Sequence, residues 1–210
     1  MASNIDATKP TVGEALTQDV RNNFLAAKNE ISDLQQVRMI RLASTDDVSS
    51  IFQQCAVNNV PQVVSFNQTT FNYPAGNAAF EFDTVNNEVI FKETGIYDVS
   101  VSLHVVRQVA GAGTADWSIH SQLKTPSGGV FTNFPSSMRL ATFDGTVANF
   151  KRFVGIGFKS VVTEANTRIR WMQTCTDVSK TVGIISYPAA GALPAAAGVI
   201  FSMHRIGDLP

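Results

Sequence analysis

The pattern of hydrophobic and polar positions changes character near residue 42. Before that point, apolar residues recur every three or four positions, which is the spacing of one face of an α-helix. This apolar stripe consists of Leu16, Val20, Phe24, Ala27, Ile31 and Leu34. The spacing predicts a helix over about residues 17–36, with Thr17 as a candidate N-cap and Asp19 in the first turn. Residues 1–16 show little periodicity, and we expect them to form an extended arm.

From about Val60 onwards, apolar and polar residues alternate, which is typical of β-strands with one buried face. The longest alternating run covers residues 96–105, and we expect its odd-numbered side chains to share one face. The members of that face are Tyr97, Val99, Val101, Leu103 and Val105. The other segments predicted to form strands are residues 63–66, 80–83, 88–93, 117–123, 150–162, 168–175 and 197–206.

Many short strands separated by Gly- and Asn-rich turns, with no later helical pattern, predict an all-β sandwich or barrel. We therefore expect three regions along the chain. Residues 1–42 form an arm and helix for attachment or oligomerisation, residues 43–59 form a connector, and residues 60–210 form the β-sandwich.

The apolar stripe of the predicted helix must be buried, and two alternatives remain for what covers it. The helix can pack on its own β-domain, or it can pack in a short coiled coil or a groove on a partner. Its terminal position and narrow stripe favour the partner. The candidate partner-binding residues are Leu16, Val20, Phe24, Ile31 and Leu34.

Composition narrows the range of partners. Sixteen basic and seventeen acidic residues leave a formal charge of −1, so the chain lacks the basic field that nucleic-acid binding and anionic membranes require. We expect neither a nucleic-acid nor a membrane partner. Charged residues make up only 16% of the chain, which fits a surface partly buried against other subunits. The fourteen phenylalanines either fill the core or extend onto a second face that another subunit covers.

Candidate chemistry is sparse, and we expect no enzymatic activity, no cofactor and no metal. No Gly-x-Ser-x-Gly elbow occurs, and Gly155 and Gly157, which lack the third glycine of a dinucleotide loop, favour close packing in a strand. Cys55 and Cys175 are expected to be free thiols, with a bridge between them left open.

The remaining polar candidates have structural interpretations, and the histidines and arginines also have possible binding roles. The three histidines are His104, His120 and His204, and they lie on separate predicted strands. We expect surface positions for them, although His104 or His204 could bind a metal or anion on a threefold axis. Asp46 and Asp47 are expected to be solvated or capping carboxylates. Arg168 and Arg170 share a strand face, where they are either solvated or paired with a carboxylate of another subunit.

The β-region resembles the C1q/TNF-like jelly roll. Phe91, Thr94, Gly95 and Tyr97 match an F-x-x-T-G-x-Y element that leads into a long inner strand, and residues 199–206 are similar to the closing strand. The resemblance covers about residues 60–206 and implies a jelly-roll β-sandwich and a homotrimer. The residues that we expect in the core or at the trimer interface are Phe91, Tyr97, Val99, Val101, Leu103, Phe201 and Met203.

The arm has a resemblance of its own. Lys9-Pro10-Thr11, residues 20–24 and residues 28–31 are similar to the leading segment of tailed-bacteriophage virion proteins, among them capsid decoration proteins and short fibres. Together the two resemblances imply a trimeric capsid decoration, or cement, protein that binds a major capsid protein or another virion protein through its arm. Such a protein is made in the host cytoplasm and resides on the capsid surface. The alternatives are a tail-fibre or tail-tip receptor-binding protein and, of another class, a carbohydrate-binding or hydrolytic domain.

Overall fold

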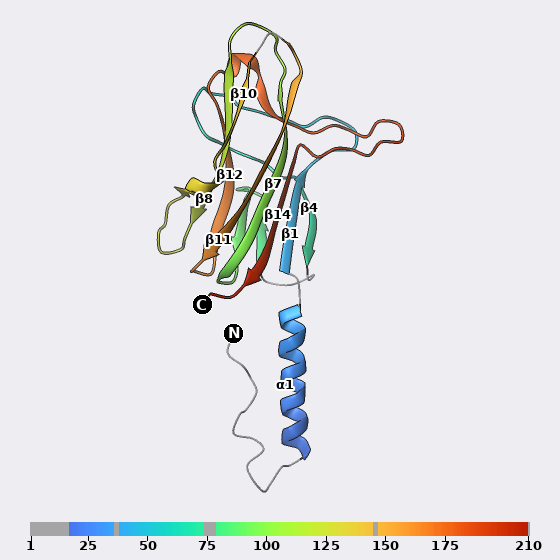
Figure 1. Ribbon diagram of the computed structural model, residues 1–210. Coiled ribbons are helices and arrows are strands. Elements are labelled where there is room, and N and C mark those ends of the chain that lie inside the picture. Colours follow the sequence, from blue (N-terminus) through green and yellow to red (C-terminus); the bar gives the residue numbers. More distant parts are fainter. Residues whose placement is uncertain (1–16, 36–37, 74–78, 145–146, 210) are drawn as a thin grey trace. The chain divides into compact units, whose positions relative to one another are not determined.

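The computed structural model describes residues 17–35, 38–73, 79–144 and 147–209. The chain divides into two compact units, Met1–Val37 and Arg38–Pro210. The first unit contains the helix α1 (Thr17–Gln35), which confirms the helix predicted from the apolar spacing. The second unit contains the strands, which form a two-layered sandwich (Figure 1).

In the described part of the chain, the strands form two seven-stranded sheets in which all pairs are antiparallel. Sheet I consists of β1 (Arg38–Ser44), β2 (Phe52–Gln54), β4 (Gln68–Tyr73), β7 (Gly95–Arg107), β11 (Phe150–Val162), β13 (Val182–Ile185) and β14 (Val199–Gly207). Sheet II consists of β3 (Gln62–Val63), β5 (Phe80–Asp83), β6 (Glu88–Phe91), β8 (Ala115–Lys124), β9 (Thr132–Asn133), β10 (Arg139–Phe143) and β12 (Thr167–Cys175). Two short 3₁₀ helices, η1 (Pro135–Ser137) and η2 (Val178–Lys180), lie in the connections.

The order of strands mixes distant parts of the chain. Sheet I runs β2-β13-β7-β14-β1-β4, and β11 pairs with the other edge of β7 along its whole length. Sheet II runs β10-β8-β12-β6-β5, with β9 beside β8 and β3 beside β12. The chain crosses from one sheet to the other at most connections, so neither sheet can form alone. The segment between β13 and β14 projects sideways from the sandwich (Figure 1).

The core lies between the two sheets and is built from alternate side chains. Along β7, the odd-numbered residues from Tyr97 to Val105 are at most 1% exposed, which confirms the face predicted from the sequence. Trp117 and Trp171 enter the same core from sheet II. The Phe91 and Tyr97 rings meet edge to face with centroids 4.7 Å apart. Each such large apolar side chain contributes about 1.5–3 kcal/mol by leaving water.

The sandwich begins earlier than predicted, so the expected boundaries of the arm and connector were wrong. β1 pairs with both β14 and β4, and its Ile40 and Leu42 side chains are fully buried. Its alternation was hidden because it is short and follows the helical stripe directly. β2 lies within the expected connector, residues 43–59, and has only three residues at the edge of sheet I. Residues 38–59 therefore belong to the β-unit.

A buried arginine organises the connection between β7 and β8. Arg107 is 0% exposed, and its guanidinium donates hydrogen bonds to main-chain carbonyls rather than to a carboxylate. The accepting carbonyls belong to Val109, Gly111, Gly113 and Phe143. Because these acceptors replace water around the buried charge, the side chain holds the loop closed over the end of the sandwich.

The T-G-x-Y element forms a corner where β7 begins. Gly95 has a φ of +152°, and a Cβ there would lie 2.8 Å from both the Arg205 Nε and the Gly207 carbonyl oxygen. The Tyr97 hydroxyl donates a 2.8 Å hydrogen bond to the carbonyl of Glu93. Arg205 donates a 3.0 Å hydrogen bond to the Thr94 carbonyl, which joins β14 to the same corner. The structure thus gives a local reason for the glycine and the tyrosine of the motif.

We predict that Gly95→Ala lowers the free energy of unfolding by about 1–3 kcal/mol, because it strains the backbone and displaces Arg205. Chemical denaturation of the purified protein measures this change. Gly207→Ala is the matched control, since a Cβ at Gly207 meets nothing within 4 Å. Equal stability of the two variants would contradict the role assigned to Gly95.

Candidate functional site

The outer face of sheet I is one of the two sheet faces that the core leaves free. Directly opposed residues on neighbouring strands share a face, so alternation places the even residues of β7 and β14 and the odd residues of β11 and β1 outside. We call these residues the outer face of sheet I. They are Ile96, Asp98, Ser100, Ser102, His104, Lys151, Phe153, Gly155, Gly157, Lys159, Val161, Ile200, Ser202, His204, Met39, Arg41 and Ala43.

The centre of this face consists of small residues. Gly155 lies opposite Ser102, Gly157 lies opposite Ser100, and Ser202 lies on the other side of Ser100. A Cβ at Gly155 or Gly157 would come no closer than 4.0 Å to any neighbour, so packing within the chain does not require glycine. The expected close packing within the strand is therefore wrong for a single chain. Because interior glycines weaken a strand, their effect here is a flat surface open to close approach.

Exposed apolar side chains border the small centre. Phe153 is 67% exposed and Val161 is 59% exposed, and both belong to β11. Among the described strands, β11 pairs only with β7, so its other edge is unpaired. Ile206 at the end of β14 is 45% exposed. A free strand edge beside exposed aromatic and branched side chains is a surface that another protein chain can cover.

A hollow of about 430 Å³ lies at the opposite side of the same face. Met39, Arg41 and Ile200 line it from β1 and β14, together with Ala195 and Ala197. The face therefore carries two different features, a projecting apolar edge at β11 and a concave region at β1 and β14.

The histidines do not converge within one chain. His104 and His204 both lie on the outer face of sheet I, but their positions differ by six residues along the sheet, which is about 20 Å. The His204 Nε2 lies 3.7 Å from the Asp98 Oδ2, whereas the His104 ring lies beside Phe153. His120 faces outward from sheet II. Where the structure describes the chain, no three His, Cys, Asp or Glu side chains form a group that could hold a metal ion.

The predicted interface-or-core residues all belong to the core. None of them exceeds 1% exposure, so they cannot contact another copy. They are Phe91, Tyr97, Val99, Val101, Leu103, Phe201 and Met203. The sequence missed the residues that are exposed on the other side of the same strands, because alternation separates two faces without saying which one is buried within the chain.

Several apolar side chains of the helix are exposed, as binding to a partner requires. Phe24 is 73% exposed and Ile31 is 54% exposed, whereas Val20 is half-buried. Leu25 is 56% exposed and widens the stripe that the spacing predicted. Leu16 lies outside the described residues, and so does the side chain of Leu34. Within the described residues, no helix combines the length and apolar character that a membrane span needs.

Sequence left two alternatives for Arg168, a solvated position or pairing with a carboxylate of another subunit, and the structure shows that its carboxylate partners lie in the same chain. The Arg168 guanidinium donates to Glu88 at 2.7 Å and to Asp83 at 3.2 Å. Arg170 lies 3.8 Å from the centre of the Phe131 ring and donates to the Gln122 side chain at 2.9 Å.

The other ionisable candidates are also structural. The main-chain N–H groups of Val48 and Ser49 donate to Asp46 and lower the pKa of its carboxyl. This carboxylate organises a turn, as expected for a capping residue.

Cys55 and Cys175 are free thiols, as expected, and both are fully buried. They are hydrogen-bonded to each other, which raises the pKa of Cys55 and lowers the pKa of Cys175 to about 7. Their enclosure between the sheets excludes a role as exposed nucleophiles.

Solved structures share this fold. Among those similar to the chain is Eiger TNF from S. frugiperda, with a TM-score of 0.54 and 8% sequence identity, covering 84% of this chain and 96% of that chain. The globular domain of zebrafish complement 1qA protein has a TM-score of 0.48 and 10% identity, covering 82% of this chain and 99% of that chain. Murine APRIL has a TM-score of 0.47 and 9% identity, covering 81% of this chain and 99% of that chain. No protein-family model matches the sequence, and no match to a curated protein is significant.

The predicted fold class is therefore confirmed: the β-unit is an all-β jelly-roll sandwich of the C1q/TNF-like type. An identity of 8% establishes the fold alone, and neither an activity nor a partner follows from it.

We predict that neither cysteine reacts with Ellman's reagent in the native protein, because both side chains are 0% exposed. Both react within the mixing time once guanidinium chloride unfolds the sandwich. Rapid labelling of one equivalent of thiol under native conditions would contradict the burial of Cys175, whose lowered pKa would otherwise make it the faster thiol.

Proposed function

We propose that this protein is a virion structural protein, a capsid decoration protein with a trimeric jelly-roll head and an N-terminal attachment arm. The observation that carries the proposal is the outer face of sheet I, with its small centre and exposed apolar border. The helix α1 carries the attachment, because it exposes Phe24 and Ile31.

The small centre supports self-association. Gly155, Gly157 and Ser100 present almost no side-chain volume over neighbouring strands, so the backbone of a second copy can approach closely. Burial of Phe153 and Val161 against that copy supplies the hydrophobic stabilisation that a flat polar centre lacks.

The two unlike features of the face favour a closed ring. A head-to-tail contact joins two different patches, and it closes into a ring when the rotation between copies allows it. In the proposed assembly, the β11 edge with Phe153 packs into the hollow that Met39 and Ile200 line on the next copy. Three copies are the number that the C1q/TNF-like resemblance implies.

Attachment stabilises the shell by mass action. A protein that binds the assembled shell but not its separated subunits lowers the free energy of the assembled state in proportion to the logarithm of its free concentration. Exposed apolar residues on α1, including Leu25, supply the contact area for a capsid partner.

A tail-fibre or tail-tip receptor-binding protein is the second candidate. The observation that favours it is the projecting segment between β13 and β14, in which Tyr187 pairs with Ala196 and Ala190 pairs with Leu193. Leu193 is 70% exposed there, and exposed loop tips on a rigid scaffold commonly carry recognition. Counting copies in purified virions separates the two candidates, since decoration requires hundreds of copies and a fibre requires only a few.

We predict that Gly157→Lys converts the trimer into a 22.6 kDa monomer, because a long charged side chain enters the contact while nothing in its own chain is displaced. Light scattering after size-exclusion chromatography measures the mass, and thermal melting followed by circular dichroism checks the fold. Leu140→Lys is the matched control, because Leu140 is 61% exposed on sheet II. A folded Gly157→Lys trimer, or a wild-type monomer, would contradict the assigned face.

We further predict that deletion of residues 1–36 abolishes binding to virus particles while the trimer persists. The deletion removes α1 and leaves every strand, since the β-unit begins at Arg38. Co-sedimentation with particles that lack the protein measures binding. Undiminished binding of the truncated protein would place attachment on the jelly roll, and loss of the trimer would place oligomerisation on the helix.

A further inference from the structure

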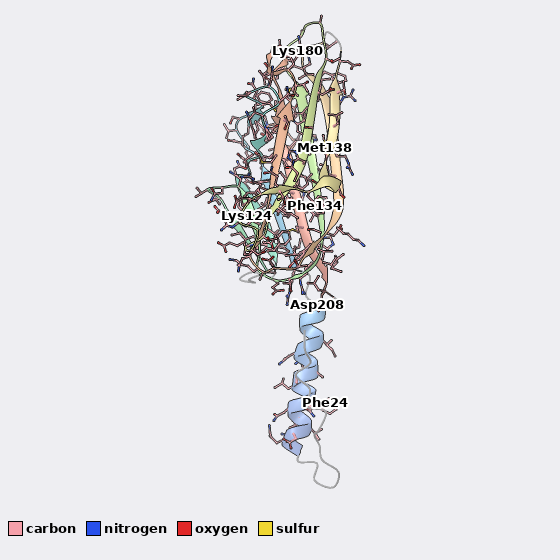
Figure 2. The ribbon with its side chains drawn as sticks, turned by 90° about the vertical axis from the view of Figure 1, so that its left-hand side faces the viewer. Phe24, Lys124, Phe134, Met138, Lys180 and Asp208 are labelled. Atoms are coloured by element: carbon pink, nitrogen blue, oxygen red, sulfur yellow. The ribbon has the colours of Figure 1, made fainter. Side chains whose placement is uncertain are left out.

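A second hollow, of about 520 Å³, lies on the outer face of sheet II. Its floor consists of outward-facing side chains of two paired strands: Ser118 and His120 from β8 and Thr174 from β12. Figure 2 shows the neighbouring residues Phe134 and Met138 on the face turned towards the viewer, with Lys124 to the left of Phe134. The volume falls within the range of about 300–1,000 Å³ that is usual for small-molecule sites.

Both walls of the hollow are held in place by hydrogen bonds. On one side, the main-chain N–H of Asn59 donates to the Cys175 carbonyl at 2.8 Å. On the other side, the N–H of Phe134 donates to the Ser121 carbonyl at 2.9 Å, and the Ser137 hydroxyl accepts from the Ser121 N–H at 2.8 Å. A ligand therefore meets a site that is already formed.

The polar groups of the lining are uncharged. The side chains of Asn59 and Asn133 supply amides, Ser118 and Thr174 supply hydroxyls, and His120 supplies an imidazole. Burial lowers the pKa of His120 despite the opposing hydrogen bond that the ring donates to Asn133, so the ring is neutral near pH 7. The lining of this hollow contains no Lys, Arg, Asp or Glu among the described residues.

The cations on the neighbouring strands already have partners. Arg139, next to the lining residue Met138, donates to the Met138 carbonyl at 2.7 Å. The Arg170 guanidinium lies 3.8 Å and the Lys124 ammonium lies 5.6 Å from the centre of the Phe131 ring. Phosphate, sulfate and carboxylate ligands would therefore find no free counter-charge in the lining.

Apolar side chains share the hollow with these polar groups. Pro61, Phe134 and Met138 line it, and Met138 is 54% exposed at its border. A purely apolar ligand would strip water from amides and hydroxyls without replacing their hydrogen bonds. The lining instead suits a molecule with many neutral hydroxyls and a few apolar C–H faces.

We propose that this hollow binds an uncharged saccharide, whose hydroxyls pair with the amides of Asn59 and Asn133 and the hydroxyls of Ser118 and Thr174. The C–H face of the sugar packs on Phe134 and Met138. The site lies within one protomer and on the sheet opposite the proposed trimer face, so it holds whether or not the copies associate.

The test uses the full-length protein on an array of neutral and charged glycans, followed by calorimetric titration of the strongest neutral oligosaccharide. Ser118→Trp fills the floor, and we expect it to abolish binding. Asn133→Ala removes one amide, and we expect affinity to fall about tenfold, as for the loss of one hydrogen bond to a ligand. The matched controls are Thr163→Trp and Asn72→Ala, two exposed positions away from the hollow, which leave affinity unchanged.

Three results would overturn the proposal: no binding of any neutral glycan, preference for charged glycans, or undiminished binding by a folded Ser118→Trp variant. Thermal melting establishes that each variant folds. If Ser118→Trp does not fold, saturation-transfer NMR with Asn133→Ala decides, because the proposal requires weaker transfer to the sugar protons than in the wild type. The calorimetric affinity per protomer does not depend on the oligomeric state, so failure here is distinct from failure of the trimer.

Discussion

Burial of alternate side chains between two sheets is the interaction on which the rest of this molecule depends. Each strand pairs its backbone with at least one neighbour and sends alternate side chains into a common apolar layer. The chain crosses between the sheets at most connections, so that layer can only form when residues far apart in sequence arrive together. Trp117 and Trp171 from sheet II meet the β7 side chains in this way, and all are buried.

The same alternation decides what remains outside. On sheet I, the outward positions of β7 and β11 are small at the centre, as at Ser100 and Gly157, and apolar at the border, as at Phe153. On sheet II, the outward positions of β8 and β12 form a polar hollow. One sandwich thus offers two chemically different surfaces, a face of small and apolar residues on sheet I and a polar hollow on sheet II.

The corner at the start of β7 ties the ends of the β-unit to its central strand. Arg38 at the first strand pairs with Glu93, and Arg205 at the last strand lies 3.6 Å from the same carboxylate. Gly95 has no side chain because Arg205 and the chain end of β14 occupy that space. The Gly-Tyr spacing that carried the resemblance therefore reflects a packing requirement rather than a binding site.

The sequence by itself determined the helix, the long alternating strand β7 and the all-β class, because each rests on a local period that a single segment displays. It also predicted free thiols and sparse chemistry. It did not separate core from interface, since alternation distinguishes two faces and only the second sheet shows which one is covered. Only the tertiary structure placed β1 in sheet I and brought Asn59, Ser118, Asn133 and Thr174 into one hollow. These decisions depend on pairing between distant segments, for which no local pattern exists.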